Sequence, residues 1–232
     1  MKIPLVQIHF FRYEGFRNKY WAFSMMQLAY PMLRSIPGLT FYKMLGTGAG
    51  NGFSPFPDFS VYGLLTVWEN EELAVSFMKD SVLFNRFNQR SSEIWSLFMH
   101  PLSSHGSWDG INPFKPDDPE LEGEKIAVIT RATLDPKKMI TFWKNVPQAS
   151  EILKDQEGLI QSFGIGEWPL SRMATFSLWE NEESLKKYAY QSEEHLDVIR
   201  KTRSLNWYTE ELFSRFRPYK SLGSWEGKDV PV

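Results

Sequence analysis

Short runs in the second half of the chain alternate between apolar and polar residues, a period of two that is typical of β-strands with one buried face. The runs that predict strands are 158–166, 172–179, a short one at 221–225, and 126–133. In the last of these, Arg131 lies on the same face as Ile129. A charged side chain is therefore expected on the inner face of a strand.

Helices are expected between these strands. Asp135 and Pro136 suit the N-cap and the first position of a helix. The apolar residues that follow at helical spacing are Met139, Phe142, Trp143, Val146 and Leu153. Asn181 is expected to cap a second helical stretch, whose longer part runs over 192–216.

Two motifs occur twice, in the same order. Residues 67–72 (VWENEE) recur as 178–183 (LWENEE), and residues 106–110 (GSWDG) recur as 223–227 (GSWEG). This self-similarity predicts an internal duplication.

Each copy is expected to run β-α-β-β-α-β, the order of a ferredoxin-like unit with helices on one face of an antiparallel sheet. The stretch 111–120 is rich in proline and acids and has no periodic apolar pattern, so the boundary is expected near Pro116. We therefore predict an α+β fold with two tandem ferredoxin-like units, 1–116 and 117–232. Their two sheets would face each other and form a closed barrel within one chain.

Composition narrows the class of protein. Apolar residues make up 42% of the chain and aromatic residues 16%, which excludes a disordered protein. The 26 Lys and Arg nearly balance the 28 Asp and Glu, so the net charge of -2 provides no basic field for binding nucleic acid. The chain has no cysteine, so a metal would need His, carboxylate or Tyr ligands. No signal peptide or long apolar window is found, which predicts a soluble cytoplasmic protein.

The first copy contains a glycine-rich insertion at 47–57 that the second copy lacks. Its glycine spacing resembles a dinucleotide-binding loop, but the third glycine of that motif is missing and prolines follow where the helix should begin. Two interpretations remain. The insertion is either a plain flexible connection or the mouth of an apolar pocket, in which Phe53 and Phe56 would be shielded from water.

His195 replaces a phenylalanine of the first copy and shares its helix face with Tyr188 and Ile199. Such a histidine is either a buried core residue or a ligand of heme iron, which needs a neutral imidazole on a rigid element. His100 and His105 have no third ligand at metal spacing, so no zinc site is expected there.

Two arginines are expected on neighbouring strands. The alignment of the two copies pairs Arg131 with His9. An inward-facing guanidinium must be paired or must serve an anion, so Arg131 either forms a salt bridge, for example to Glu167, or has a functional role. Arg172 has the same two interpretations.

Several segments between residues 5 and 227 carry a resemblance to a known family. These segments are 41–53 (FYKMLGTGAGNGF), 131–133 (RAT), 142–143 (FW), 146–147 (VP), 175–179 (TFSLW) and 211–216 (ELFSRF). Together they resemble the spheroidene monooxygenases, the carotenoid 2-ketolases of phototrophic bacteria.

This resemblance implies a heme enzyme that inserts oxygen from O₂ at carbon 2 of an acyclic carotenoid. Two hydroxylations would give a gem-diol, which loses water to form a ketone. It further implies a lipophilic substrate, an external electron donor such as reduced ferredoxin, and peripheral contact with the inner face of a membrane. No oligomeric state is predicted.

The duplicated plan also resembles the chlorite dismutases and dye-decolorising peroxidases, in which a helix histidine of the C-terminal half binds heme. This resemblance favours His195 as the iron ligand. The other residues expected at the heme are Tyr188, Ile199 and Trp143 as contacts, and Arg131 and Arg172 as groups that polarise oxygen or hold the propionates.

Two alternative functions stay open. One is a heme-dependent oxygenase or dehydratase that acts on another lipophilic substrate, because a fold does not fix its chemistry. The other is a heme carrier or sensor without catalysis.

Overall fold

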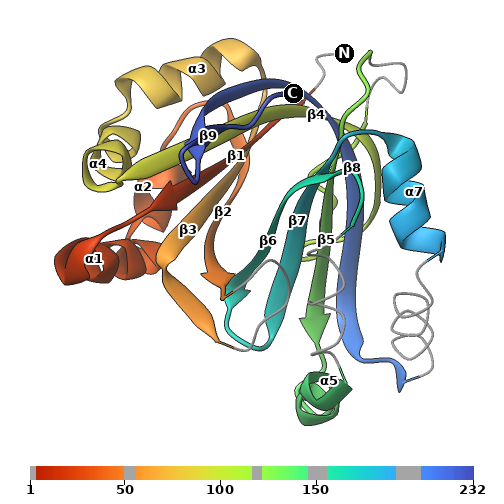
Figure 1. Cartoon of the computed structure of the whole chain (residues 1–232). Coiled ribbons are helices and arrows are strands. Elements are labelled where there is room, and N and C mark those ends of the chain that lie inside the picture. Colours follow the sequence, from red (N-terminus) through yellow and green to blue (C-terminus); the bar gives the residue numbers. More distant parts are fainter. Residues whose placement is uncertain (1–3, 50–55, 117–121, 146–155, 192–204) are drawn as a thin grey trace.

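The computed structural model describes residues 4–49, 56–116, 122–145, 156–191 and 205–232 (Figure 1). The elements of the first half are β1 (Leu5–Arg12), α1 (Gly15–Leu28), α2 (Tyr30–Arg34), β2 (Leu39–Gly48), β3 (Pro57–Trp68), α3 (Glu71–Asp80), α4 (Val82–Arg90) and β4 (Glu93–Gly106). Those of the second half are β5 (Ile126–Leu134), α5 (Met139–Asn145), β6 (Leu159–Trp168), β7 (Arg172–Trp179), α7 (Glu182–Gln191), β8 (Tyr208–Trp225) and β9 (Lys228–Asp229).

Strands β1 to β8 form a closed antiparallel barrel. Their order is β4-β1-β3-β2-β6-β7-β5-β8, and β8 pairs back onto β4 over most of its length. The short pairing of β2 with β6, through Gly46 and Gly166, joins the two halves on the other side. The predicted α+β fold and closed barrel are confirmed, and two residue pairs between β2 and β6 complete the closure.

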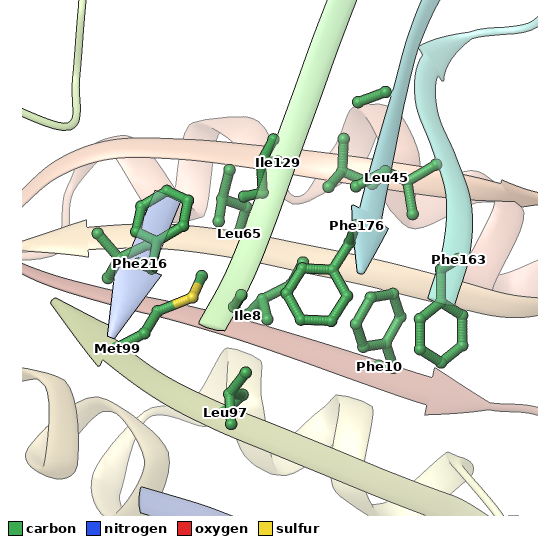
Figure 2. Packing of buried hydrophobic residues seen from close by; sticks show 14 of the residues in the cluster. Ile8, Phe10, Leu45, Leu65, Leu97, Met99, Ile129, Phe163, Phe176 and Phe216 are labelled. Carbon is green, nitrogen blue, oxygen red and sulfur yellow. The ribbon is translucent and has the colours of Figure 1, made fainter. Parts of the chain in front are cut away.

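The interior of the barrel is filled by apolar side chains from both halves. Figure 2 shows Phe10 and Leu97 of the first half beside Phe163, Phe176 and Phe216 of the second. The rings of Phe10 and Phe163 stack with centroids 3.8 Å apart. The two halves therefore share one core, and neither buries its inner sheet face alone.

Helices α1 to α4 cover the outer face of the first-half strands, as Figure 1 shows. Side chains such as Phe11, Leu64 and Phe98 point outward from the sheet and are buried under these helices. In the second half, α5 and α7 pack on two smaller separate clusters, one around Trp207 and one around Trp179.

The expected helices needed two corrections. The predicted helical stretch over 192–216 is wrong at its end, because Tyr208–Trp225 is the long strand β8. Inward Leu212 and Phe216 alternate there with outward residues, a period of two that the sequence reading overlooked. Asp135 accepts the N–H of Lys137, the contact expected of an N-cap, but a turn follows it and α5 begins only at Met139.

Other expectations for the second half are met in part. The short strand expected at 221–225 is the end of β8, and Val146 and Leu153 of the expected helix lie outside the described residues. The strands predicted at 126–133, 158–166 and 172–179 are β5, β6 and β7. Asn181 caps α7 by accepting the N–H of Ser184 at 2.8 Å. In the part of the chain that the structure describes, no helix combines the length and apolarity needed to cross a bilayer.

The expected pairing of Arg131 with His9 is wrong by one residue. When Trp68 and Trp179 are taken as equivalent positions, the strand registers make Arg131 the counterpart of Phe10. A shift of one residue along a strand moves a side chain to the opposite face of the sheet. His9 accordingly lies outside the barrel under α4, whereas Arg131 lies inside it.

Candidate functional site

A large cavity lies between α1 and the barrel, where the two halves meet. Its volume is about 820 Å³, and its walls come from α1, the adjoining ends of β2 and β3, and the β6–β7 hairpin. Apolar side chains that line it include Met26, Leu28, Phe59, Trp168, Leu170 and Met173. A cavity of this size and character is suited to an apolar ligand.

Glycines keep one wall of the cavity flat. Gly46 and Gly166 pair across β2 and β6, and both line the cavity. A Cβ added to Gly46 would meet only the Gly166 carbonyl oxygen, at 3.8 Å, so the space above Gly46 is open. At Gly166 a Cβ would lie 2.7 Å from the Arg172 carbonyl oxygen, so close backbone approach requires glycine there.

Tyr62 supplies a polar group to this apolar wall. The side chain is buried, and its hydroxyl has no hydrogen-bond partner among the described residues. Burial, together with the nearby Asp58 carboxylate, raises the pKa of Tyr62 to about 12. The phenol is therefore protonated at neutral pH and can donate a hydrogen bond to a ligand in the cavity.

Beneath the cavity, charged residues gather at one end of the barrel. This charged cluster consists of Lys43, Asp109, Arg131, Glu167, Arg172 and Glu210. Glu167 lies at its centre: one carboxylate oxygen accepts Lys43 Nζ at 2.8 Å and the other accepts Trp108 Nε1 at 2.7 Å. Glu167 also lines both the large cavity and an adjoining one of about 260 Å³. The cluster therefore forms part of the cavity wall.

Arg131 is 1% exposed and contacts three carboxylates. It forms an ion pair with Glu210, and its Nη2 lies 3.6 Å from Glu167 Oε1 and 3.8 Å from Asp109 Oδ1. Its guanidinium carbon also lies 5.5 Å from the centre of the Trp108 ring. The three carboxylates balance the buried charge, whereas Arg131 Nε and Nη2 have no hydrogen-bond partner among the described residues.

The opposite end of the barrel carries a smaller and more exposed set of charges, in which Arg12 lies 3.1 Å from Glu93 and 3.6 Å from Glu226. In the strand registers, Arg131 is the counterpart of Phe10 and Lys43 is the counterpart of Phe163. Two stacked aromatic rings at one end thus correspond to two cations at the other. Buried cations in place of packed aromatic rings do not make a barrel more stable. The charged end next to the cavity is therefore the better candidate for function.

The neighbouring groups shift two pKa values in the cluster. Burial alone would lower the pKa of Lys43, but hydrogen bonds from its ammonium to Asp109 and Glu167 hold that pKa above its usual value. Burial would raise the pKa of Glu210, yet the N–H of Gly110, the Ser107 hydroxyl and Arg131 together lower it to about 2. Both groups are therefore ionised at neutral pH.

The lowered pKa of Glu210 predicts a loss of stability in acid. A carboxyl with a folded-state pKa below its ordinary 4.5 stabilises the fold above that pH, and the contribution is lost as the pH falls towards about 2. We expect the melting temperature of the Glu210→Gln variant to depend less on pH across this window than that of the parent. Parallel curves for the two proteins would contradict the assigned contacts.

The structure brings Arg131 and Arg172 together, as the sequence predicted for neighbouring strands. Arg172 Nη1 lies 3.4 Å from Asp109 Oδ1 and 4.0 Å from Glu167 Oε2. The salt bridge suggested between Arg131 and Glu167 is present. Arg172 is half-exposed and lines the smaller cavity, whereas Arg131 is enclosed.

Trp143 and Tyr188 lie in separate places on the outer face of the second half. Trp143 Nε1 donates to the carbonyl of Leu170 at 3.0 Å, which places it beside the large cavity. Tyr188 stacks on Trp179 with ring centroids 5.2 Å apart, and burial raises its pKa to about 12. His195, Ile199 and Phe53 lie outside the described residues.

The predicted loop 47–57 is partly β-structure. Thr47 and Gly48 belong to β2 and Pro57 to β3, and the N–H of Ala49 donates to the Phe56 carbonyl at 2.8 Å. Both strand ends line the large cavity. The described ends of the insertion are therefore paired strand residues at the cavity.

Curated proteins of known name match this chain over nearly its whole length. It is 34% identical over 230 residues to the spheroidene monooxygenase of Rhodobacter capsulatus, covering 98% of this chain and 95% of that protein. It is 33% identical over 225 residues to that of Cereibacter sphaeroides, covering 97% and 69%. The chain belongs to the spheroidene monooxygenase family. Members of the spheroidene monooxygenase family are oxidoreductases, and we place this protein in that class. No protein-family model matches the chain.

Among solved structures, two aldoxime dehydratases share the fold. Their TM-scores are both 0.63, with 10% and 8% identity, and the matches cover 96% and 94% of this chain and 84% and 80% of theirs. At this identity the likeness concerns the fold alone. The barrel architecture of this spheroidene monooxygenase family member is therefore shared with aldoxime dehydratases.

The described histidines do not suit a heme ligand. His9 is fully buried, accepts or donates a hydrogen bond with Ser96 at 2.8 Å, and lies edge-on to Phe84. His100 stacks on Tyr219, and neither it nor exposed His105 lines a cavity described above. The described residues also contain no group of three His, Asp or Glu that could hold a metal ion.

Sequence reasoning missed several residues of the site. Lys43 was visible as a lone cation in the apolar run Phe41–Leu45, a signal that could have been used. Asp109 lies in the repeated GSWDG motif, but neither it nor Glu210 could be placed at the cluster from sequence, because each reaches it from a separate segment. The cavity itself depends on how α1 sits against the β6–β7 hairpin, which no motif encodes.

Proposed function

We propose that the protein is a heme-dependent monooxygenase that inserts oxygen from O₂ into a long apolar substrate, an acyclic carotenoid, with hydroxylation leading to a ketone. The observation that carries this proposal is the apolar cavity of about 820 Å³ in a chain of the spheroidene monooxygenase family. A polyene carries no charge, so its site needs apolar walls rather than ion pairs. The walls formed by α1 and the β6–β7 hairpin meet this need.

Bound heme would supply the oxidising power that amino-acid side chains lack for attack on an unactivated carbon. We assign the iron ligand to His195, with Tyr188 and Ile199 from the same sequence region as contacts. Electrons would come from an external donor such as reduced ferredoxin. Trp143 fixes the Leu170 carbonyl at the cavity and would orient the β6–β7 turn against the bound groups.

The two arginines are assigned different roles. Arg172 is half-exposed at the smaller cavity and can reach a bound anionic group such as a heme propionate. Arg131 is enclosed by carboxylates, so we assign it a positioning role. Through Glu167 it holds the end of β6 that forms part of the cavity wall.

The insertion at 47–57, which contains Phe53 and Phe56, is proposed as the mouth of the cavity. The two halves, 1–116 and 117–232, are proposed as tandem ferredoxin-like units that arose by duplication. In support, Glu93 accepts the N–H of Gly227 at 2.8 Å, and Glu210 accepts the N–H of Gly110 at the same distance. The protein is proposed to act in the cytoplasm, in contact with the inner face of a membrane.

Replacement of the iron ligand tests the proposed function. The parent, reconstituted with hemin, should show a Soret band and should convert an acyclic carotenoid to a ketone when O₂ and reduced ferredoxin are supplied. His195→Ala should lose stoichiometric heme binding and at least about a hundredfold in turnover. The matched control His105→Ala changes an exposed histidine and should behave as the parent.

The outcomes separate the proposal from its alternatives. Heme binding with no oxidation of any lipophile would favour a carrier or sensor. Oxidation or dehydration of another lipophile in place of the carotenoid would assign a different substrate. An unchanged Soret band in His195→Ala would contradict the ligand assignment.

A further inference from the structure

Helix α1 carries aromatic side chains on the face that points away from the barrel. Phe16 is 83% exposed, Tyr20 is 65% exposed, and Phe23 is half-exposed. The three residues follow one another at spacings of four and three, so they form one stripe along the helix. The opposite face of α1 is apolar as well, with Ala22 and Met25 buried against the sheet. A helix that is apolar on both faces needs a second apolar environment besides the core.

The stripe leads to the large cavity. The rings of Phe16 and Tyr20 stack with centroids 6.2 Å apart, and the ring of Phe23 meets Phe59 of β3 edge-on at 5.9 Å. Phe23 and Phe59 line the cavity, as does exposed Trp168 of the β6–β7 hairpin. In Figure 1, the start of β3 and the β6–β7 turn lie at the lower end of the barrel, with α1 beside them. We call Phe16, Tyr20, Phe23, Phe59, Trp168 and Leu170 the aromatic rim.

The α1 part of the aromatic rim lies among positively charged residues, although the net charge of the whole protein is negative. The chain has no Asp or Glu from Gly15 to Pro57, although these residues number 28 among 232. The same stretch contains Arg17 and Lys19 within α1. The acids that border this stretch are Glu14, exposed directly before α1, and Asp58, which accepts the N–H of Ser60 at 2.7 Å. Because the whole protein has a net charge of -2, a basic patch here is specific to this surface.

We propose that the aromatic rim inserts into the headgroup region of a lipid bilayer that contains anionic lipids, and that the cavity opens onto the membrane there. Aromatic side chains partition into this region, and Arg17 and Lys19 would meet lipid phosphates. This inference deepens the proposed function, on which it rests for the identity of the substrate. A carotenoid dissolved in the bilayer could enter the cavity without crossing water.

A second copy of the chain fits this surface less well. In a symmetric dimer the same surface of each copy meets the other, so Arg17 and Lys19 would face their own counterparts, and Glu14 before α1 is the one acid near them in sequence. Lipid phosphates provide the missing negative charge. The charge pattern therefore favours the bilayer.

Flotation with vesicles tests the proposal without turnover. The parent should float with vesicles of phosphatidylcholine and phosphatidylglycerol, less with phosphatidylcholine alone, and less again at high salt. Phe16→Ser/Tyr20→Ser should lower the partition coefficient at least about tenfold, because both apolar anchors are removed from exposed positions. Arg17→Glu/Lys19→Glu should remove the preference for phosphatidylglycerol. The matched control is Val75→Ser/Val82→Ser, which changes exposed apolar residues on α3 and α4 and should float as the parent does.

Several results would overturn the proposal. These are absence of flotation by the parent, equal flotation by Phe16→Ser/Tyr20→Ser, or a dimer in analytical ultracentrifugation that this variant dissociates. Oxidation of a detergent-solubilised carotenoid is measured in parallel. Oxidation without flotation would support the proposed function and contradict membrane insertion by the aromatic rim. Flotation through the aromatic rim without oxidation would support membrane insertion and contradict the proposed function.

Discussion

Replacement of Gly46 by phenylalanine is expected to abolish oxidation of a carotenoid while the protein still folds. Gly46 lines the large cavity, and its backbone conformation is one that other amino acids adopt readily. A Cβ added there would meet only the Gly166 carbonyl oxygen, at 3.8 Å. An aromatic ring there would occupy the space we assign to the polyene. We expect turnover to fall by about a hundredfold or more, because even small misplacement of a substrate has effects of this size.

A graded series at this position provides the control. Gly46→Ala adds one methyl group and should retain most of the turnover, whereas Gly46→Val should be intermediate. Circular dichroism and the melting temperature should stay close to those of the parent throughout the series, and heme binding should persist. Full carotenoid oxidation by Gly46→Phe would mean that the substrate binds elsewhere.

The architecture was largely predictable, because it depends on periodicity and repetition. The strands at 126–133, 158–166 and 172–179 alternate clearly, and the repeated VWENEE and GSWDG motifs lie at equivalent places in the two halves. Strand β8 was missed because Ser214 faces inward and Phe213 outward, so its pattern reads only weakly as one apolar face. The alignment that paired Arg131 with His9 also matched Val6 with Val128, and such a match does not fix which face of a strand the two residues occupy.

The site was predictable only in part, for a physical reason. An inward arginine on a strand must find carboxylates, and this argument led to Arg131 and to Glu167 as a partner. Which other acids complete the cluster depends on barrel closure, which brings Glu210 of β8 and Asp109 after β4 to the same end. The aromatic rim escaped notice because periodicity identifies apolar residues without showing which of them remain outside the core.

Replacement of Arg131 by methionine is expected to cause the largest loss of stability. The guanidinium is 1% exposed, and its removal leaves Glu210 and Glu167 without their shared cation. Breaking a buried ion pair by removal of one partner costs about 3–5 kcal/mol. We expect a loss of this size in the free energy of unfolding from urea titration. Wild-type stability would contradict the positioning role that we assign to Arg131.

A double-mutant cycle separates the ion pair from simple packing. In Arg131→Met/Glu210→Gln the uncompensated carboxylate is also removed, so part of the lost stability should return, which packing alone does not predict.

Arg12, which pairs with Glu93 at the opposite end of the barrel, provides the matched control. Its side chain is 30% exposed, so solvent screens the pair and Arg12→Met should cost only about 1 kcal/mol. Equal costs at the two ends would mean that the cluster beside the cavity is no more than a second copy of the Arg12 pair. A greater loss of stability in Arg131→Met than in Arg12→Met would link the stability of this barrel end to the cavity. The link is Glu167, which contacts Arg131 and also lines the cavity.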